Sequence, residues 1–169
     1  MTFQIGEKVV YPNHGVGTIE NISSRTFGNQ TEKFYLLRLS ANNMTVMVPF
    51  SHVDQVGLRK VARNGDVNKV LGYLANGPSK TCQDWKDRFK ENSAKMQSGS
   101  LLEIAEVLKC LVEIQAQKPL SFREKKMLER ARLMLVAELA TSRGVSEGEA
   151  VQLLSRSLAK ASLKFPEPL

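Results

Sequence analysis

The sequence predicts an α+β protein of two domains, a small antiparallel β domain followed by an all-α helical domain. Two observations support this class: the apolar residues of the first part recur as in short strands, and after residue 61 they recur with a helical period. The length agrees, because 169 residues, 42% of them hydrophobic, can form two small cores. We therefore expect one domain over residues 1–61 and a second over residues 62–169.

Four short segments of the first domain have the composition of strands. They are rich in Val, Ile, Phe and Tyr, and Asn, Gly and Ser separate them, as in a small antiparallel sheet or barrel. The segments are KVVYP (8–12), VGTIENI (16–22), KFYLLRL (33–39) and MTVMVPF (44–50).

The last of these segments has the features of an edge strand. Alternation assigns its side chains to two faces, with Met44, Val46 and Val48 on one and Thr45, Met47 and Pro49 on the other. Because Pro49 has no backbone N–H, the strand should end there or lie at the edge of the sheet. An edge offers unpaired backbone groups to a partner strand. Alternatively, a loop or the second domain covers Met47, and the residues alone leave both possibilities open.

The second domain has helical periodicity and clear helix starts. Apolar stripes are expected at 67–74, ending at Gly77 and Pro78, at 101–112, and in a third helix from Phe122 to Thr141. A Ser three residues before a Glu is typical of a helix start, where the two side chains satisfy backbone N–H groups. Such pairs are Ser100 with Glu103, Ser121 with Glu124, and Ser146 with Glu149. The final segment KFPEPL (164–169) is expected to be frayed.

The composition disfavours an enzyme, a metal site and a membrane protein. The two cysteines, Cys82 and Cys110, are far apart and lack metal-ligand spacing, and His14 and His52 are the only histidines. There is no glycine-rich phosphate loop and no nucleophile elbow. No apolar run approaches the roughly 18 residues of a membrane span, and no secretory signal precedes the first strand. We expect a cytoplasmic protein without a cofactor.

The chain is basic, and most of its net charge of +7 lies after residue 61. In the segment KPLSFREKKMLERAR (118–132), Arg123, Lys126 and Arg130 fall on one flank of the apolar stripe and Lys125 and Arg132 on the other. Cations that frame a stripe in this way can follow a phosphate backbone. A solvated basic surface is the alternative.

The only tryptophan, Trp85, lies in the basic stretch TCQDWKDRFKEN (81–92). As a core residue it would pair with Phe89 and fix a short helix to its neighbours. As a DNA-binding residue it would be exposed among Lys86, Arg88 and Lys90, and it would insert between bases or stack on them. The residue pattern does not choose between these roles.

Seven segments taken together resemble the bacterial CarD/CdnL family of transcription regulators. They are GEKVVYPNHGVGTIENI, YLLRL, MTVMVP, VGLRK, DWKDRFKEN, GSLLEIAEVLKCL and LSFREKKMLERARLMLVAEL, in this order, over about residues 2–160. The resemblance implies a non-enzymatic protein with an N-terminal Tudor-like β-barrel, shared with transcription-repair coupling factors, that binds the RNA polymerase β subunit. It also implies a helical domain that contacts promoter DNA at the upstream edge of the transcription bubble, where a tryptophan enters the minor groove.

The resemblance also suggests site residues. Arg25, Met47 and Pro49 match polymerase-contacting positions, and Thr45, on the same predicted strand as Met47 and Pro49, is expected to contact polymerase with them. Trp85 matches the tryptophan wedge. Two residues depart from the family pattern. Asp87 stands where relatives often have a basic residue, and Met47 stands where some relatives have arginine. The remaining predicted DNA-binding residues are Lys86, Arg88, Lys90, Phe122, Lys125 and Lys126.

These expectations combine into one function. The barrel would tether the protein to polymerase, and Trp85 would occupy a groove that exists only in opened DNA, so the protein would favour the open complex. We expect a monomer that reaches the nucleoid through RNA polymerase and makes no membrane contact. The main alternative is a stand-alone architectural DNA-binding protein, or an RNA-binding protein with a KOW-like barrel, that does not depend on polymerase.

Overall fold

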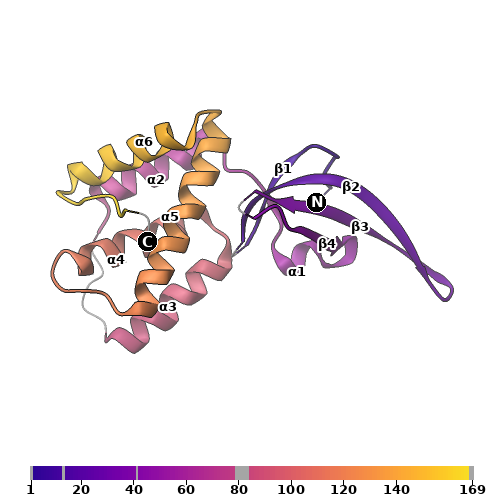
Figure 1. The fold of residues 1–169 in the computed structure, drawn as a ribbon, viewed down its shortest axis with the longest axis horizontal. Helices are drawn as coiled ribbons and strands as arrows, with labels where there is room; N and C mark the ends of the chain where they lie inside the picture. Colours follow the sequence, from indigo (N-terminus) through magenta and orange to yellow (C-terminus); the bar gives the residue numbers. More distant parts are fainter. Residues whose placement is uncertain (1, 13, 41, 79–83, 168–169) are drawn as a thin grey trace. The chain divides into compact units, whose positions relative to one another are not determined.

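The computed structural model describes residues 2–12, 14–40, 42–78 and 84–167, and for Trp85 it describes the backbone alone. Cys82 therefore lies outside the described residues. The chain divides into two compact units, Met1–Val61 and Ala62–Leu169, and each has its own apolar core (Figure 1). The predicted α+β class, an antiparallel sheet followed by helices, is confirmed.

The N-terminal unit is a five-stranded antiparallel sheet with the strand order β4-β3-β2-β1-β5. Within the described residues, β4 pairs only with β3 and β5 only with β1, so these two strands are the edges of the sheet. The strands are β1 (Lys8–Tyr11), β2 (Gly15–Phe27), β3 (Gln30–Leu39), β4 (Thr45–Pro49) and β5 (Arg59–Lys60). A 3-10 turn, η1 (Phe50–His52), and a short helix, α1 (Val53–Val56), connect β4 to β5.

The core of this unit lies on one face of the sheet. Val9, Ile19 and Leu37 are fully buried there. The ring of Tyr35 stacks on Phe50 with the ring centroids 4.1 Å apart, and its hydroxyl accepts a hydrogen bond of 3.0 Å from the backbone N–H of Phe3. The contact between Phe3 and Tyr35 holds the N-terminal segment on the sheet.

Strand β2 is longer than the sequence predicts. We expected it to end at Ile22, but it continues through two serines to Phe27, and pairing with β3 is unbroken from Asn21 to Phe27. The two-residue turn begins at Gly28, whose φ of 62° glycine adopts without strain. Cross-strand pairing therefore outweighs the weak strand preference of serine. The resulting β2–β3 ribbon carries Arg25 and extends away from the rest of the sheet (Figure 1).

Gly17 lies at a close approach of β2 and β3, and we expect Gly17→Ala to destabilise the N-terminal unit. An added Cβ would lie 2.7 Å from Leu37 Cδ1 and 2.9 Å from the carbonyl oxygen of Arg38, which is part of the sheet backbone. The free energy of unfolding should fall by about 1–3 kcal/mol, as in overpacked cores. Denaturant unfolding measures this change.

The matched control is Gly65→Ala in the helical unit, where an added Cβ has open space. Because alanine is favoured over glycine in a helix, this variant should be as stable as the wild type or more stable. An unfolding midpoint of Gly17→Ala equal to that of the wild type would show that β2 and β3 move apart at little cost.

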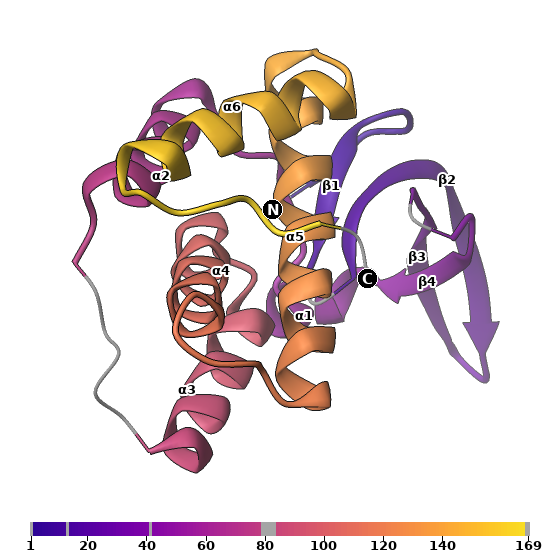
Figure 2. The same ribbon diagram turned by 60° about the vertical axis from the view of Figure 1, so that its left-hand side comes forward.

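The helical unit is built around α4 (Leu101–Gln115), which packs against three other helices (Figure 2). Nine of its residues are buried, on more than one face, as expected for a central helix. The other helices are α2 (Asn64–Asn76), α3 (Trp85–Ser98), α5 (Phe122–Arg143) and α6 (Glu147–Lys160). All three predicted helix starts are confirmed, because Ser100, Ser121 and Ser146 each accept a hydrogen bond from the backbone N–H three residues later.

The C-terminal segment is not frayed where the structure describes it, so that prediction was wrong. Phe165 is only 9% exposed and belongs to the core of the helical unit. Sequence position alone suggested a loose end, but a single buried aromatic ring is enough to anchor the segment. No helix among the described residues is long and apolar enough to cross a membrane.

Candidate nucleic-acid interface

The first turns of α3 and α5 lie side by side at one end of the helical unit (Figure 1). The Arg88 guanidinium makes two hydrogen bonds to the Glu124 carboxylate, with Nε–Oε2 at 3.0 Å and Nη2–Oε1 at 3.1 Å. Next to this pair, the Arg123 guanidinium lies 5.2 Å from the centroid of the Phe89 ring. Two segments more than thirty residues apart in sequence therefore form one surface.

This surface, here called the basic face, carries exposed cations beside an exposed aromatic ring. Phe122, the first residue of α5, is 66% exposed, and Lys126 Nζ lies 4.7 Å from the centroid of its ring. Asp84 and Asp87, both exposed on the α3 side, offset part of the positive charge. The exposed cations of the basic face are Lys86 and Lys90 on α3 and Arg123 and Lys126 on α5.

Lys125 lies on the flank of α5 away from Arg123. There it lines a hollow of about 410 Å³ together with Leu128 of the same helix and Lys164 of the C-terminal segment. The helical period predicts Lys125 and Lys126 on opposite flanks of the apolar stripe, and the structure places them there. Arg132, expected on the same flank as Lys125, pairs with Glu129, which lines the same hollow, and it is nearly buried.

The predicted DNA-binding residues differ in exposure and in location on the helical unit. Lys86, Lys90, Phe122 and Lys126 are exposed and belong to the basic face, whereas Lys125 is exposed on the opposite flank of α5. Trp85 begins α3, but its side chain lies outside the described residues. Arg123 was not among the predicted DNA contacts. Its place on the same flank of the apolar stripe as Lys126 is the sequence feature that could have identified it.

Arg88 differs from the expectation, because it is only 5% exposed. Its hydrogen bonds with Glu124 raise the pKa of Arg88, although burial opposes its charge. A guanidinium committed to a buried carboxylate is poorly available to a phosphate. We therefore remove Arg88 from the set of phosphate contacts; nothing in the local sequence distinguishes it from Lys86 and Lys90.

On the N-terminal unit, the predicted polymerase-binding residues lie at the β4 edge and on the β2–β3 ribbon. Thr45 and Met47 are exposed, Pro49 is partly buried and Arg25 is exposed opposite Glu32. As predicted, Val48 points into the core and Met47 away from it. Met44, expected on the face of Val48, precedes the strand and is 57% exposed.

The backbone direction of β4 follows from its pairing with β3. The Leu39 N–H donates to the Met44 carbonyl at 2.8 Å, and the register pairs Val46 with Leu37. Because hydrogen-bonded and non-hydrogen-bonded pairs alternate in an antiparallel ladder, Val46 and Val48 direct their backbone groups toward β3. Thr45, Met47 and Pro49 therefore direct theirs toward the open edge, where Pro49 needs no N–H partner.

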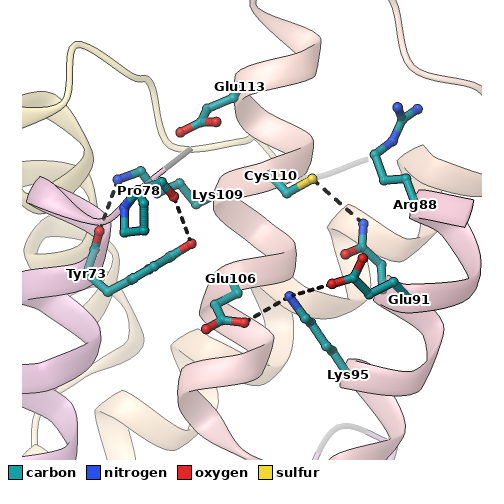
Figure 3. Close-up of a pocket in the computed structure, with 10 residues that line it drawn as sticks. Tyr73, Pro78, Arg88, Glu91, Lys95, Glu106, Lys109, Cys110 and Glu113 are labelled. Carbon is teal, nitrogen blue, oxygen red and sulfur yellow. Dashed lines mark hydrogen bonds and ion pairs between the residues drawn. The ribbon is translucent and has the colours of Figure 1, made fainter. Parts of the chain in front are cut away.

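A further group of charged residues fills the space between α2, α3 and α4 (Figure 3). Lys109 Nζ donates to the carbonyls of Tyr73 at 3.0 Å and Gly77 at 2.9 Å, at the C-terminal end of α2. Lys95 pairs with Glu106 at 2.9 Å and with Glu91 at 3.5 Å. The remaining cavity of about 10 Å³ has room for roughly one water molecule. These charged groups therefore form hydrogen bonds and ion pairs with one another and leave no space for a ligand.

The electrostatics of this group favour structure over chemistry. Burial raises the pKa of the Cys110 thiol, so the thiol is protonated and unreactive at neutral pH. Burial opposes the charge of Lys95, but Glu106 and Glu91 outweigh it and raise the pKa of Lys95. Within the described part of the chain, no group of His, Cys, Asp and Glu residues is arranged to hold a metal ion.

Comparison with known proteins gives matches over both units. A family model described as "CarD-like/TRCF RID domain" matches residues 3–62, and one described as "CarD, C-terminal domain" matches residues 69–155. The Bacillus subtilis (strain 168) protein named "Putative transcription factor YdeB" is 37% identical over 145 residues, which cover 86% of this chain and 95% of that protein.

Two solved structures from Myxococcus xanthus are also similar to this chain. The structure of "CdnLNt" shares 39% identity, covers 36% of this chain and 86% of its own, and has a TM-score of 0.31. The solution NMR structure of the N-terminal domain of CarD shares 34% identity, covers 35% of this chain and 79% of its own, and has a TM-score of 0.30.

Proposed function

Because this chain belongs to the CarD family and is a transcription-associated regulator, we propose that it binds the RNA polymerase β subunit through the β4 edge and stabilises the promoter open complex through its helical unit. The observation that carries the proposal is a pair of unlike surfaces on the two units. One offers unpaired backbone groups at a strand edge, and the other offers exposed cations around an aromatic ring.

The β4 edge suits the addition of a partner strand. Thr45 and Met47 each offer an outward N–H and C=O, and Pro49 offers a C=O. Backbone pairing of this kind supplies affinity, and neighbouring side chains supply specificity. Here the exposed Met47 offers an apolar contact, and Arg25 on the ribbon offers a cation to an acidic partner.

The basic face suits the DNA backbone. Each phosphate that a lysine or arginine neutralises steepens the log–log salt dependence of binding by roughly 0.9, so three or four contacts already make binding strongly dependent on salt. Such contacts position the protein without reading sequence. Tethering to polymerase raises the local concentration of the helical unit beside the promoter, so a weak affinity for DNA is sufficient.

Trp85 supplies the preference for opened DNA in this proposal. An inserted aromatic side chain needs a widened, unstacked groove, which is present at the edge of the bubble in the open complex. A protein that binds the open complex more tightly than the closed one shifts the equilibrium by that difference in affinity, with about 1.4 kcal/mol giving a factor of ten.

The strand edge is tested with Thr45→Pro. Thr45 is the first residue of β4, where proline is compatible with a strand, and its N–H points away from β3. The substitution therefore removes an outward donor and keeps the pairing of β3 with β4. We expect the affinity for purified RNA polymerase to fall about tenfold, because a buried backbone acceptor in the partner loses its donor.

The matched control is Thr45→Ala, which removes the side chain and keeps the N–H, and which should bind polymerase nearly as the wild type does. Equal affinities for the alanine and proline variants would exclude pairing at this edge. Tight binding to promoter DNA without polymerase, and unchanged by Thr45→Pro, would instead support the stand-alone nucleic-acid-binding alternative.

A further inference from the structure

We propose that the buried Arg88–Glu124 ion pair is a positioning element, which holds the Trp85 end of α3 at a fixed place beside the cations of α5. This inference rests on the function proposed above. It assigns Arg88 and Glu124 a role that acts through Trp85 and the basic face rather than through contact with DNA.

Two of the three buried side chains that the structure describes on α3 are polar. These side chains belong to Arg88, Asn92 and Met96, spaced four apart on one face, and among them Met96 joins the apolar core. Asn92 Nδ2 donates to Cys110 Sγ at 3.9 Å on α4. Apolar packing tolerates small slips, whereas a two-bond contact between guanidinium and carboxylate fixes direction as well as distance. The orientation of α3 therefore depends on these polar contacts.

The ion pair joins the two turns that carry the proposed DNA contacts. Arg88 lies in the first turn of α3, three residues after Trp85, and its backbone N–H donates to the Asp84 carbonyl at 2.9 Å. Glu124 lies in the first turn of α5, two residues after Phe122. The buried ion pair is thus a direct link between the turn that carries Trp85 and the turn that carries the cations of α5.

The Glu124 carboxylate is itself held in place. The Ser121 hydroxyl accepts a hydrogen bond from the Glu124 backbone N–H at 3.3 Å and donates to its Oε1 at 3.5 Å. Both Glu124 and Arg88 are at most 5% exposed. The Glu124 carboxylate therefore has a fixed orientation that does not depend on Arg88. A contact that positions another helix requires such a fixed partner.

Glu124→Gln distinguishes positioning from phosphate contact by the sign of its effect. If Arg88 binds a phosphate, removing the neighbouring negative charge frees the guanidinium and strengthens DNA binding. If the pair positions α3, the same substitution weakens DNA binding. Glutamine has the size of glutamate and also supports the helix start after Ser121, so α5 should begin unchanged.

The experiment measures the affinity of the full-length protein for the RNA polymerase–promoter open complex over a series of NaCl concentrations. We expect Glu124→Gln to weaken binding about tenfold, the effect of losing a charge-assisted hydrogen bond, with an unchanged salt slope. Affinity equal to or tighter than that of the wild type overturns the proposal.

A second variant, Arg88→Met, completes a double-mutant cycle. Positioning predicts that Glu124→Gln has little further effect once Arg88 is replaced, and that the salt slope stays as in the wild type. A direct phosphate contact predicts that the slope of Arg88→Met falls by about 0.9, and this result overturns the proposal. If Arg88→Met does not fold, the sign of the effect of Glu124→Gln still decides.

Amide hydrogen exchange supplies an independent readout, because it reports which segment loosens. In Glu124→Gln we expect faster exchange in the first turns of α3 and unchanged exchange in α4. Uniform loosening of the helical unit would indicate a general structural role and contradict the proposal. The outcomes also separate the two hypotheses. A defect in Trp85→Ala without one in Glu124→Gln overturns positioning alone, and so does normal promoter opening by Trp85→Ala, whereas a wild-type protein that neither binds RNA polymerase nor changes promoter opening overturns the proposed function.

Discussion

Trp85→Ala should remove most of the promoter opening that the protein promotes while its affinity for RNA polymerase stays that of the wild type. Contact of an aromatic side chain with a base contributes about 1–3 kcal/mol. Losing about 2 kcal/mol of preference for the open complex lowers the ratio of open to closed promoter roughly thirtyfold. Because Trp85 belongs to the helical unit, the substitution leaves the β4 edge, the proposed polymerase-binding surface, unchanged.

The measurement uses purified bacterial RNA polymerase and a promoter that carries a fluorophore near the upstream edge of the bubble. Trp85→Phe is the graded control, because it keeps a smaller aromatic ring and should retain part of the effect. If Trp85→Ala opens promoters as the wild type does but unfolds at lower denaturant concentration, Trp85 is a core residue and the basic face alone carries the effect on DNA.

Lys109→Met should lower the free energy of unfolding by about 2–3 kcal/mol. Lys109 is 3% exposed, and its ammonium group donates to the carbonyls of Tyr73 and Gly77 at the end of α2 (Figure 3). Methionine has a similar shape but no donor, so the Gly77 carbonyl loses a charged partner in a largely closed site. The Tyr73 carbonyl keeps a hydrogen bond from the Gly77 N–H, which limits the loss.

Denaturant unfolding measures this effect, and Lys118→Met serves as its control. Lys118 is exposed just beyond α4, so its replacement should change the free energy of unfolding by less than about 0.5 kcal/mol. An equally small effect for Lys109→Met would show that water replaces the ammonium group at α2. Neither variant alters the basic face, so the salt dependence of DNA binding should be unchanged in both.

The candidate site could be predicted from the sequence where it depends on local features. The S-x-x-E pairs gave the starts of α4, α5 and α6 because a capping serine meets a backbone N–H only three residues away. Pro49 indicated an edge strand because proline lacks the donor that an inner strand needs. The α+β class followed from two hydrophobic periods, which likewise depend on near neighbours.

Arg88 shows where local features stop being informative. It stands among exposed lysines and shares their charge, yet it is buried because Glu124 lies opposite it, 36 residues later. Lys109 is a similar case, since its partners on α2 come 32 and 36 residues earlier. Burial of a charge is favourable only where a partner compensates for lost hydration, and that partner is supplied by packing of distant segments.

The sequence by itself therefore determined the two-part α+β plan, the helix starts, the edge strand and the excess of positive charge after residue 61. Only the tertiary structure decided which cations remain exposed, which pair inside the helical unit, how far β2 continues, and that Phe165 anchors the C-terminal segment. The physical reason is the same in each case. Periodicity and capping act over three or four residues, whereas burial, ion pairing and strand pairing depend on segments that only the fold brings together.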